Sequence, residues 1–484
     1  MIYVILVIAF FLFALILLIR TFRYSRVNAE KTARVPVEID IEEAAQRLGK
    51  AISYQTVSTQ SFEDFNESAF LKMHQYLEKA FPLIHERLEK EVVNDYSLLY
   101  YWEGKQPELK PAMLTCHLDV VPVEPGTERD WKHPPFEGTI SEGYIWGRGA
   151  MDVQGGVLAI MEAVEYLLSQ NFEPERNIIL GFGHDEEVDG EKGAYAIGKH
   201  LAEKGVELEY LLDEGTPIVH DVLAELPNPV ALIAVAEKGY LSLELSTTAE
   251  GGHSSVPQGL TAIAKLSEAV HKLENNPMNC KVDGLVKQTM VAIGPQMPFL
   301  YRIVMANLWL FRGLVKKELT RMPATKAALG TTIATTIFES GIKENVLPTQ
   351  AKATVNFRIH PNDDIKTVKE HVSRTINDRE VTITELPGSI NPSHVSEVEA
   401  KPYKILKKTI RNAFPEVVVA PTLMVGATDA RHYAHLTDNI YRFIPLRADE
   451  SDLDRVHGTN ERLSKENYRE MIYFYIRLIK ESTT

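Results

Sequence analysis

The residues best suited to chemistry follow apolar segments of the sequence. His117 and Asp119 come after the apolar residues 112–115, and side chains two residues apart in an extended chain point to the same side. Asp152 follows the segment 147–149, in which glycine allows tight turns and a close approach of the backbone to a ligand. A hydrogen-bonded histidine and a helix N-cap are the ordinary structural alternatives. Because zinc binds histidine nitrogen and carboxylate oxygen, these residues are candidate metal ligands.

Two acidic groups follow further apolar segments. Residues 185–187 (Asp-Glu-Glu) come after the apolar residues 177–182, and Asp213 with Glu214 come after residues 210–212. Adjacent carboxylates repel one another unless a cation or solvent separates them. A solvated loop explains most acidic clusters, but here they recur at the ends of predicted strands, as the candidate ligands above do. Histidine and carboxylates that converge at strand ends are the ligands that zinc prefers, and two close metal ions would need a shared carboxylate between them.

These motifs need a sheet to bring them together. Up to residue 240, short apolar runs alternate with helical patterns, among them residues 156–168 and 194–204. Strands that alternate with helices indicate an α/β fold with a mostly parallel sheet covered on both faces. In such folds the ligand site lies at the carboxyl ends of the strands, which is where the four motifs fall.

The pattern changes near residue 240. Apolar and polar residues alternate over 241–247 and 351–359, as in strands with one solvated face, whereas 277–340 has no clear pattern. We therefore predict an α+β lid inserted into the α/β domain. The predicted bounds are a transmembrane anchor at 1–19, a juxtamembrane linker at 20–36, a catalytic domain at 37–240 and 386–484, and an inserted lid or dimerisation domain at 241–385.

The N-terminal residues 1–19 form an almost unbroken apolar run without a charged side chain. A run of this length is just sufficient to cross the hydrocarbon core as a helix. A cleaved signal peptide is the alternative, but no basic residue precedes the run and no Ala-x-Ala-like site directly follows it. Arg20, Arg23 and Arg26 follow the run, and the positive-inside rule would place the rest of the chain in the cytoplasm.

Composition excludes other classes of function. A chain of 484 residues is long enough for two domains, and its net charge of -14 disfavours a nucleic-acid partner. Cys116 and Cys280 are the only cysteines, so neither a disulfide framework nor an all-cysteine zinc site can form.

The order and spacing of the motifs resemble the signature of a di-zinc metallopeptidase family, the one that contains carboxypeptidase S, aminoacylase and glutamate carboxypeptidase. The motifs that carry the resemblance are His117-x-Asp119, Gly149-x-x-Asp152, Glu186-Glu187 and Asp213. The resemblance covers essentially the whole chain after the apolar N-terminal run. It implies a zinc-peptidase catalytic domain, two Zn²⁺ ions per subunit, and hydrolysis of an amide bond next to a free carboxylate. It also implies an extracytoplasmic or luminal location, in conflict with the positive-inside argument.

The resemblance further implies which residues hold the metal ions. Asp152 would bridge the two zinc ions, and His117 with Asp213 would bind the first of them. Glu187 and His457 would bind the second.

Other residues would act on the water molecule or on the substrate. Glu186 would be the general base, and Asp119 would hydrogen-bond His117 and set its tautomer. His253 would stabilise the oxyanion, in some relatives across a dimer. The resemblance also implies that Asn345 and Arg358 hold the substrate carboxylate, and that Arg431 lies on a substrate-side loop.

The apolar segment 298–315 bears on the substrate. It could line an acyl-chain pocket or rest on a membrane, and lid core or a dimer contact is the ordinary alternative. We expect a metal-dependent hydrolase that cleaves either the amide bond of an N-acyl amino acid or a C-terminal peptide bond. The acyl group could be a fatty-acyl chain, and the reaction could be reversible. A deacylase of a biosynthetic amino-acid intermediate and a non-catalytic membrane-anchored ectodomain are the alternatives. The expected partners are a small-molecule substrate, the membrane, and a second copy bound through the lid.

Overall fold

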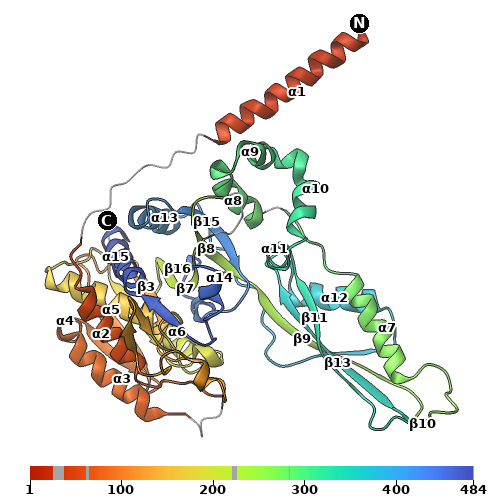
Figure 1. The fold of residues 1–484 in the computed structure, drawn as a ribbon, viewed down its shortest axis with the longest axis horizontal. Coiled ribbons are helices and arrows are strands. Elements are labelled where there is room, and N and C mark those ends of the chain that lie inside the picture. The colour runs from red at the N-terminus through yellow and green to blue at the C-terminus, as the bar shows by residue number, and fades with distance from the viewer. Residues whose placement is uncertain (26–36, 61–64, 221–225, 283, 483–484) are drawn as a thin grey trace.

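The computed structural model describes residues 1–25, 37–60, 65–220, 226–282 and 284–482. Its largest sheet has eight strands (Figure 1). In spatial order these are β1 (Glu89–Val93), β2 (Ser97–Trp102), β6 (Ile178–Gly183), β3 (Ala112–His117), β7 (Tyr210–Val219), β16 (Ile440–Ala448), β8 (Val230–Glu237) and β15 (Val418–Met424). The pairs β3–β6, β3–β7, β7–β16 and β8–β15 are parallel, whereas β1–β2, β2–β6 and β8–β16 are antiparallel. The predicted α/β class with a mixed, largely parallel sheet is confirmed.

Helices cover both faces of this sheet because side chains alternate along each strand. Leu114 and Leu180 belong to a core closed by α2 (Ile41–Ile52), α3 (Glu67–Ala80), α4 (Pro82–Arg87), α5 (Gln154–Ser169), α13 (Lys401–Ala413) and α15 (Lys465–Ser482). Met113 and Ile179, the neighbouring residues, pack instead with α6 (Ala194–Glu203) and the 3₁₀ helix η5 (Asp429–Tyr433). The strands are therefore buried on both sides and are continuously apolar.

A small three-stranded sheet joins distant segments beside the main sheet. It consists of β17 (Arg462–Ser464), β5 (Tyr144–Trp146) and β4 (Thr139–Ser141). Because β17 pairs with β5, the C-terminal segment that contains α14 (Glu450–Leu453) and His457 is brought next to the glycine-containing turn before Asp152.

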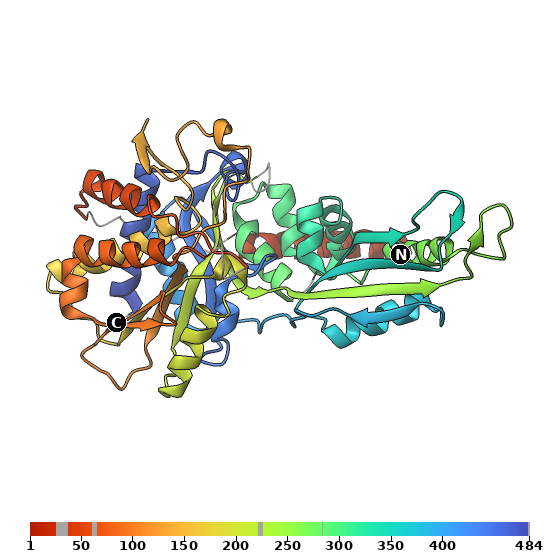
Figure 2. The same ribbon diagram turned by 90° about the horizontal axis from the view of Figure 1, so that it is seen from below.

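The inserted unit is an antiparallel sheet with helices on one face, and it extends away from the main sheet (Figures 1 and 2). Its strands lie in the order β11 (Thr332–Ser340), β13 (Gln350–Ile359), β9 (Gly239–Thr248) and β14 (Thr382–Glu385). Alternate residues of β9 and β13 pack against α7 (Ala262–Asn275) and α12 (Ile365–Ile376). The short strands β10 (Gly252–His253) and β12 (Val346–Leu347) pair at the far tip.

The segment without a clear sequence pattern contains regular structure. It forms α8 (Gly284–Ile293), α9 (Phe299–Ala306), α10 (Leu308–Leu319), α11 (Pro323–Leu329) and the strand β11. The side chains of β11 are mostly exposed or half-buried, so burial imposes no apolar alternation on this strand.

The N-terminal helix α1 (Ile2–Tyr24) extends beyond the predicted anchor end at Ile19. In the described part of the chain it is the one helix long and apolar enough to cross a membrane. Residues 26–36 of the predicted linker lie outside the described residues.

His74 on α3 should make stability depend on pH. Its side chain is buried, with Nε2 3.0 Å from the Tyr96 carbonyl oxygen, and burial lowers its pKa from 6.5 to about 4. The unfolded chain therefore binds one more proton than the folded chain as pH falls from 6.5 to about 4. The free energy of unfolding should fall over this range by on the order of 2–3 kcal/mol.

The matched variant is His74→Gln, because the Gln amide can still donate to the Tyr96 carbonyl oxygen but does not titrate in this range. Denaturant unfolding of both proteins at several pH values checks the expectation. An equally steep pH dependence in the variant would contradict it.

Candidate metal centre

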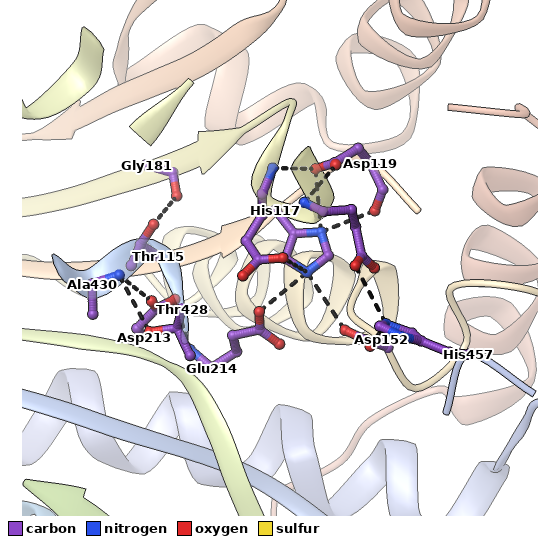
Figure 3. Close-up of polar contacts among 12 residues, drawn as sticks. Thr115, His117, Asp119, Asp152, Gly181, Asp213, Glu214, Thr428, Ala430 and His457 are labelled. Atoms are coloured by element: carbon purple, nitrogen blue, oxygen red, sulfur yellow. Dashed lines mark hydrogen bonds and ion pairs between the residues drawn. The ribbon is translucent and has the colours of Figure 1, made fainter. Parts of the chain in front are cut away.

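The four sequence motifs converge at one edge of the main sheet (Figure 3). β3 ends at His117, the 3₁₀ helix η3 (Glu186–Val188) follows β6, and Asp213 with Glu214 lie within β7. Among the described residues three groups could hold a metal ion, with ligand atoms within 4.8 Å of one another. These are His117, Asp152 and Glu214; His117, Glu186 and Glu187; and Asp152, Glu187 and His457.

His117 is oriented by the residue two positions after it. Its Nδ1 lies 2.9 Å from the Asp119 carbonyl oxygen and 3.3 Å from Asp119 Oδ1, so Nδ1–H can donate there. This leaves Nε2 facing the other acidic residues, 3.1 Å from Glu214 Oε1 and 3.5 Å from Asp152 Oδ1. Burial alone would lower the pKa of His117, but the Glu214 carboxylate raises it well above 6.5. The surroundings of Nε2 therefore favour a positive charge.

Asp119 also holds the acidic turn of η3. It is fully buried, and its two carboxylate oxygens accept hydrogen bonds from the backbone N–H groups of Glu186, at 3.2 Å, and Glu187, at 3.1 Å. One side chain thus positions the histidine and both glutamates.

Asp152 has the geometry of a bridge between two histidines. Its Oδ1 faces His117 Nε2, and its Oδ2 lies 2.9 Å from His457 Nε2. The buried Glu461 accepts hydrogen bonds from the Asp152 and Met151 N–H groups and pairs with Arg148 at 2.6 Å. Glu461 lies four residues after His457, and nothing in the local sequence indicates this bracing role.

Glu186 and Glu187 face different histidines, and Glu186 Oε2 lies 3.9 Å from His117 Nε2. Glu187 Oε2 lies 3.3 Å from His457 Nε2, whereas its Oε1 is buried without a hydrogen-bond partner among the described residues. Burial raises the pKa of Glu186 well above its usual range, and Glu214 and Asp429 raise it further. A buried orphan oxygen within a cluster of carboxylates and histidine nitrogens fits a divalent metal ion, which neutralises the cluster and takes up the free oxygen.

The structure separates Asp213 from the cluster and places Glu214 in it. Asp213 Oδ2 accepts a hydrogen bond from Ala430 N at 2.8 Å, and Oδ1 accepts one from Glu214 N at 2.8 Å (Figure 3). Burial raises the pKa of Asp213 to about 8. Asp213 as a metal ligand stays a prediction, and Glu214, which the sequence motif contained without an assigned role, is the carboxylate that faces His117.

The lid residues do not lie together. His253 and Asn345 are at the far tip, where Ser254 N donates to the Asn345 carbonyl oxygen, and His253 is exposed. Arg358 lies near the other end of β13 with its guanidinium 5.0 Å from the centre of the Tyr240 ring. Arg358 is eight residue steps along the extended strand from Gln350, a distance of about 26 Å. Within a single chain, Asn345 and Arg358 therefore lie too far apart to hold one substrate carboxylate together.

Arg431 lies close to the acidic turn but is already paired. Its guanidinium donates to the carbonyl oxygen of Asp189, at 2.9 Å, and to Asp189 Oδ1, at 3.2 Å. Its predicted contact with substrate stays a prediction.

A cleft of about 310 Å³ opens beside the cluster. Its lining combines the acidic residues Asp152, Glu186, Glu187 and Glu214 with His457. The rest of the lining is mostly apolar, and we call these side chains the apolar wall: Met151, Pro217, Met424, Ile444, Leu446, Leu453 and Val456.

A largely parallel sheet with histidine and carboxylates as candidate ligands at its strand ends, next to a carboxylate of raised pKa, is the arrangement of a metal-dependent hydrolase. The chain matches the model of peptidase family M20/M25/M40 over residues 113–481. It is 42% identical over 481 residues to the "Probable carboxypeptidase S-like 2" of Dictyostelium discoideum, a match that covers 97% of this chain and 92% of that protein. It is also 42% identical over 463 residues to the "N-fatty-acyl-amino acid synthase/hydrolase PM20D1" of Mus musculus, with 93% and 91% covered.

The fold is similar to that of a solved M20 family metallo-carboxypeptidase, Sso-CP2 from Sulfolobus solfataricus. The TM-score is 0.65 at 19% identity, and the match covers 90% of this chain and 98% of that one. The chain belongs to peptidase family M20/M25/M40, as the resemblance implied, and is a metal-dependent hydrolase.

Proposed function

We propose that the protein hydrolyses the amide bond of N-acyl amino acids that carry a long acyl chain. The observation that carries the proposal is the cleft, whose apolar wall directly adjoins the metal-binding cluster. An acyl chain buried against this wall would leave its carbonyl carbon beside the acidic residues. The similarity to a relative named for fatty-acyl-amino-acid synthesis and hydrolysis supports this substrate class and the reverse reaction.

Two zinc ions fit the clusters that the side chains form. His117, Asp152 and Glu214 would hold one ion, and Asp152, Glu187 and His457 the other, with Asp152 shared. Bound in this way, the ions would supply Lewis acidity at the scissile carbonyl and lower the pKa of a water molecule.

Glu186 would transfer the proton. As general base it takes a proton from the attacking water, whose oxygen forms a bond to the carbonyl carbon. The carbon–nitrogen bond then breaks, and Glu186 returns the proton to the leaving amine, so the products are a fatty acid and an amino acid. Burial beside Glu214 and Asp429 raises the pKa of Glu186, which makes its carboxylate a stronger base.

Parallel rate measurements test the substrate class. With one amino acid held constant, kcat/KM should be higher for the N-oleoyl than for the N-acetyl compound and for a dipeptide. Leu453→Gln, in the apolar wall, should lower the oleoyl rate by roughly 10-fold and leave the acetyl rate unchanged. Leu71→Gln, which replaces an exposed leucine on α3, is the matched control.

The same assay tests the metal requirement. Thorough chelation should abolish hydrolysis, and added Zn²⁺ should restore it. Activity that survives chelation would remove the metal mechanism, and a preference for the dipeptide would overturn the acyl substrate.

Hydrolysis of a C-terminal peptide bond is the second candidate. It is favoured by the similarity to a probable carboxypeptidase S-like protein over 97% of this chain. Faster cleavage of dipeptides than of both N-acyl compounds would support it.

We further propose that the enzyme is held on a membrane by α1, on the extracytoplasmic or luminal side that the family resemblance implies. The length and apolar composition of α1 support the anchor. Protease added to intact vesicles tests the side, because only a lumenal enzyme is protected there.

A homodimer through the lid is proposed as well. His253 is exposed at a tip far from the metal-binding cluster of its own chain, so a role in catalysis requires a second copy (Figure 1). Sedimentation that shows only monomer at assay concentrations would exclude this role.

A further inference from the structure

Helices α9 and α10 are joined by a turn at Asn307, and we call residues 299–319 the hairpin. α9 lies next to the C-terminal half of α1, whereas α10 leads away from it at a steep angle (Figure 1). The ring of Phe299 lies 6.1 Å from that of Phe22, and the ring of Trp309 lies 6.1 Å from that of Phe13. Before the hairpin, α8 also contacts α1, because Tyr24 donates a hydrogen bond to the Met290 carbonyl oxygen at 2.6 Å.

The polar residue at the turn of this hairpin, Asn307, points its side chain at α1. Asn307, between α9 and α10, is fully buried, and its amide N–H₂ donates to the Ile303 carbonyl oxygen at 2.8 Å. The same group contacts the Leu17 carbonyl oxygen at 3.4 Å and Thr21 Oγ1 at 3.5 Å. Thr21 is itself fully buried. Polar atoms are thus withdrawn from the outer surface at the turn.

The outward surface of the hairpin is apolar instead. Leu300 is 74% exposed, Trp309 56% and Leu314 58%, with Tyr301 and Leu310 exposed beside them. The basic residues Lys316 and Lys317 come at the end of α10 that is farther from the turn. Arg312 lies between, and its long side chain can extend to a polar boundary while its stem stays in apolar surroundings. The exposed Glu318 follows these lysines, so an apolar tip has a charged end behind it, which is the pattern of a segment that enters lipid.

The contacts with α1 set the depth of the hairpin. Phe13 precedes Arg20 by seven residues, which at 1.5 Å per residue is about 10 Å of helix. Half of a hydrocarbon core is about 15 Å thick. When α1 spans the membrane with Arg20 and Arg23 at one boundary, Trp309 beside Phe13 lies about 10 Å inside the hydrocarbon.

We infer that the α9–α10 hairpin is embedded in one lipid leaflet next to α1. Its partner is the acyl-chain region of the bilayer, and the inference rests on the proposed function of α1 as a membrane anchor. α1 and the hairpin share an interface, so a bilayer that surrounds α1 must also surround the exposed side of the hairpin.

The embedded hairpin is coupled to the catalytic sheet. Thr289 on α8 donates to the Pro421 carbonyl oxygen of β15 at 2.7 Å, and Ile293 packs with Val418 and Ala420 of the same strand. β15 ends at Met424, which lines the apolar wall of the cleft. The hairpin therefore holds the cleft at a fixed height above the leaflet from which an acyl substrate would come.

Tryptophan fluorescence of the full chain in phosphatidylcholine vesicles tests the inference. Trp309 is the exposed tryptophan of the four, because Trp102, Trp131 and Trp146 are 5%, 7% and 3% exposed. Lipids brominated along the acyl chain should quench Trp309, and iodide in the water should not. The quenching should disappear in Trp309→Phe. Quenching by iodide alone overturns the inference, and so does protection of Trp309 from both quenchers, which would indicate a second protein copy on this surface.

A second variant keeps Trp309 and changes its surroundings. Exchange of Leu300, Leu310 and Leu314 for Gln should weaken the quenching by brominated lipid at least twofold. The matched control exchanges Leu71, Val92 and Ile342, which are exposed elsewhere, for Gln and should leave the quenching unchanged. Equal quenching in both triple variants would contradict the inference.

Two further measurements separate this inference from the proposed function. Release of the full chain by alkaline carbonate would show that α1 is not inserted, and the anchor and the hairpin inference would fall together. Retention without quenching of Trp309 would overturn the hairpin inference alone. Hydrolysis of a soluble N-acetyl amino acid in the same vesicles tests the enzyme function independently of both.

Discussion

Glu186→Gln is expected to remove most of the turnover and to leave the metal content unchanged. Gln has the same shape but cannot accept the proton of the attacking water, and loss of a general base lowers rates by roughly 100- to 10,000-fold. The substitution leaves intact the hydrogen bond that the Glu186 backbone N–H donates to the Asp119 carboxylate. The measurements are kcat on the N-acyl substrate and metal per chain by elemental analysis.

Two comparisons make this result specific. Glu187→Gln should lose metal as well as turnover, because Glu187 Oε2 faces His457 within a candidate metal group. Glu203→Gln replaces an exposed glutamate on α6 and should change neither quantity. If Glu186→Gln lost metal to the same extent as Glu187→Gln, Glu186 would be a ligand and not the base.

Glu214→Gln is expected to remove one of the two proposed metal ions. The Glu214 carboxylate faces His117 at 3.1 Å and completes the group with Asp152, and a neutral amide is a much weaker ligand than a carboxylate. The loss of affinity should exceed the roughly 10- to 100-fold effect that follows removal of a hydrogen-bonding neighbour of a ligand. Metal titration by calorimetry on protein stripped of metal measures it.

Asp213→Asn distinguishes the two neighbouring carboxylates. In the structure Asp213 accepts hydrogen bonds from the N–H groups of Ala430 and Glu214, so its replacement should disturb the position of Glu214 only indirectly. Its effect on metal affinity should be no larger than about 10- to 100-fold. The opposite order, in which Asp213→Asn loses the ion and Glu214→Gln keeps it, would restore Asp213 as the ligand.

The exposed tip of the lid shows a limit of prediction from sequence. The motifs around His253, Asn345 and Arg358 could be recognised because each is local. The distance between Asn345 and Arg358 could not be predicted, since Asn345 precedes β13, Arg358 lies near its far end, and the extended strand holds the two apart. The sequence also did not predict β11, because the exposed and half-buried side chains of this strand leave no alternation of apolar and polar residues.

The sequence by itself determined the kind of site and the order of the elements. Apolar runs followed by histidine and carboxylates indicate strand ends with metal ligands, and strands that alternate with helices place those ends at one sheet edge. These are local patterns of spacing, which a single sequence records directly.

Only the tertiary structure decided which of two adjacent carboxylates faces the histidine. Neighbouring residues of a strand point to opposite sides, and pairing of β7 with β3 and β16 directs Glu214 to His117 and Asp213 to Ala430. It also decided that the apolar segment 298–315 packs on α1, through a contact between residues 13 and 309. Such contacts depend on how distant elements pack, and no local spacing of residues encodes them.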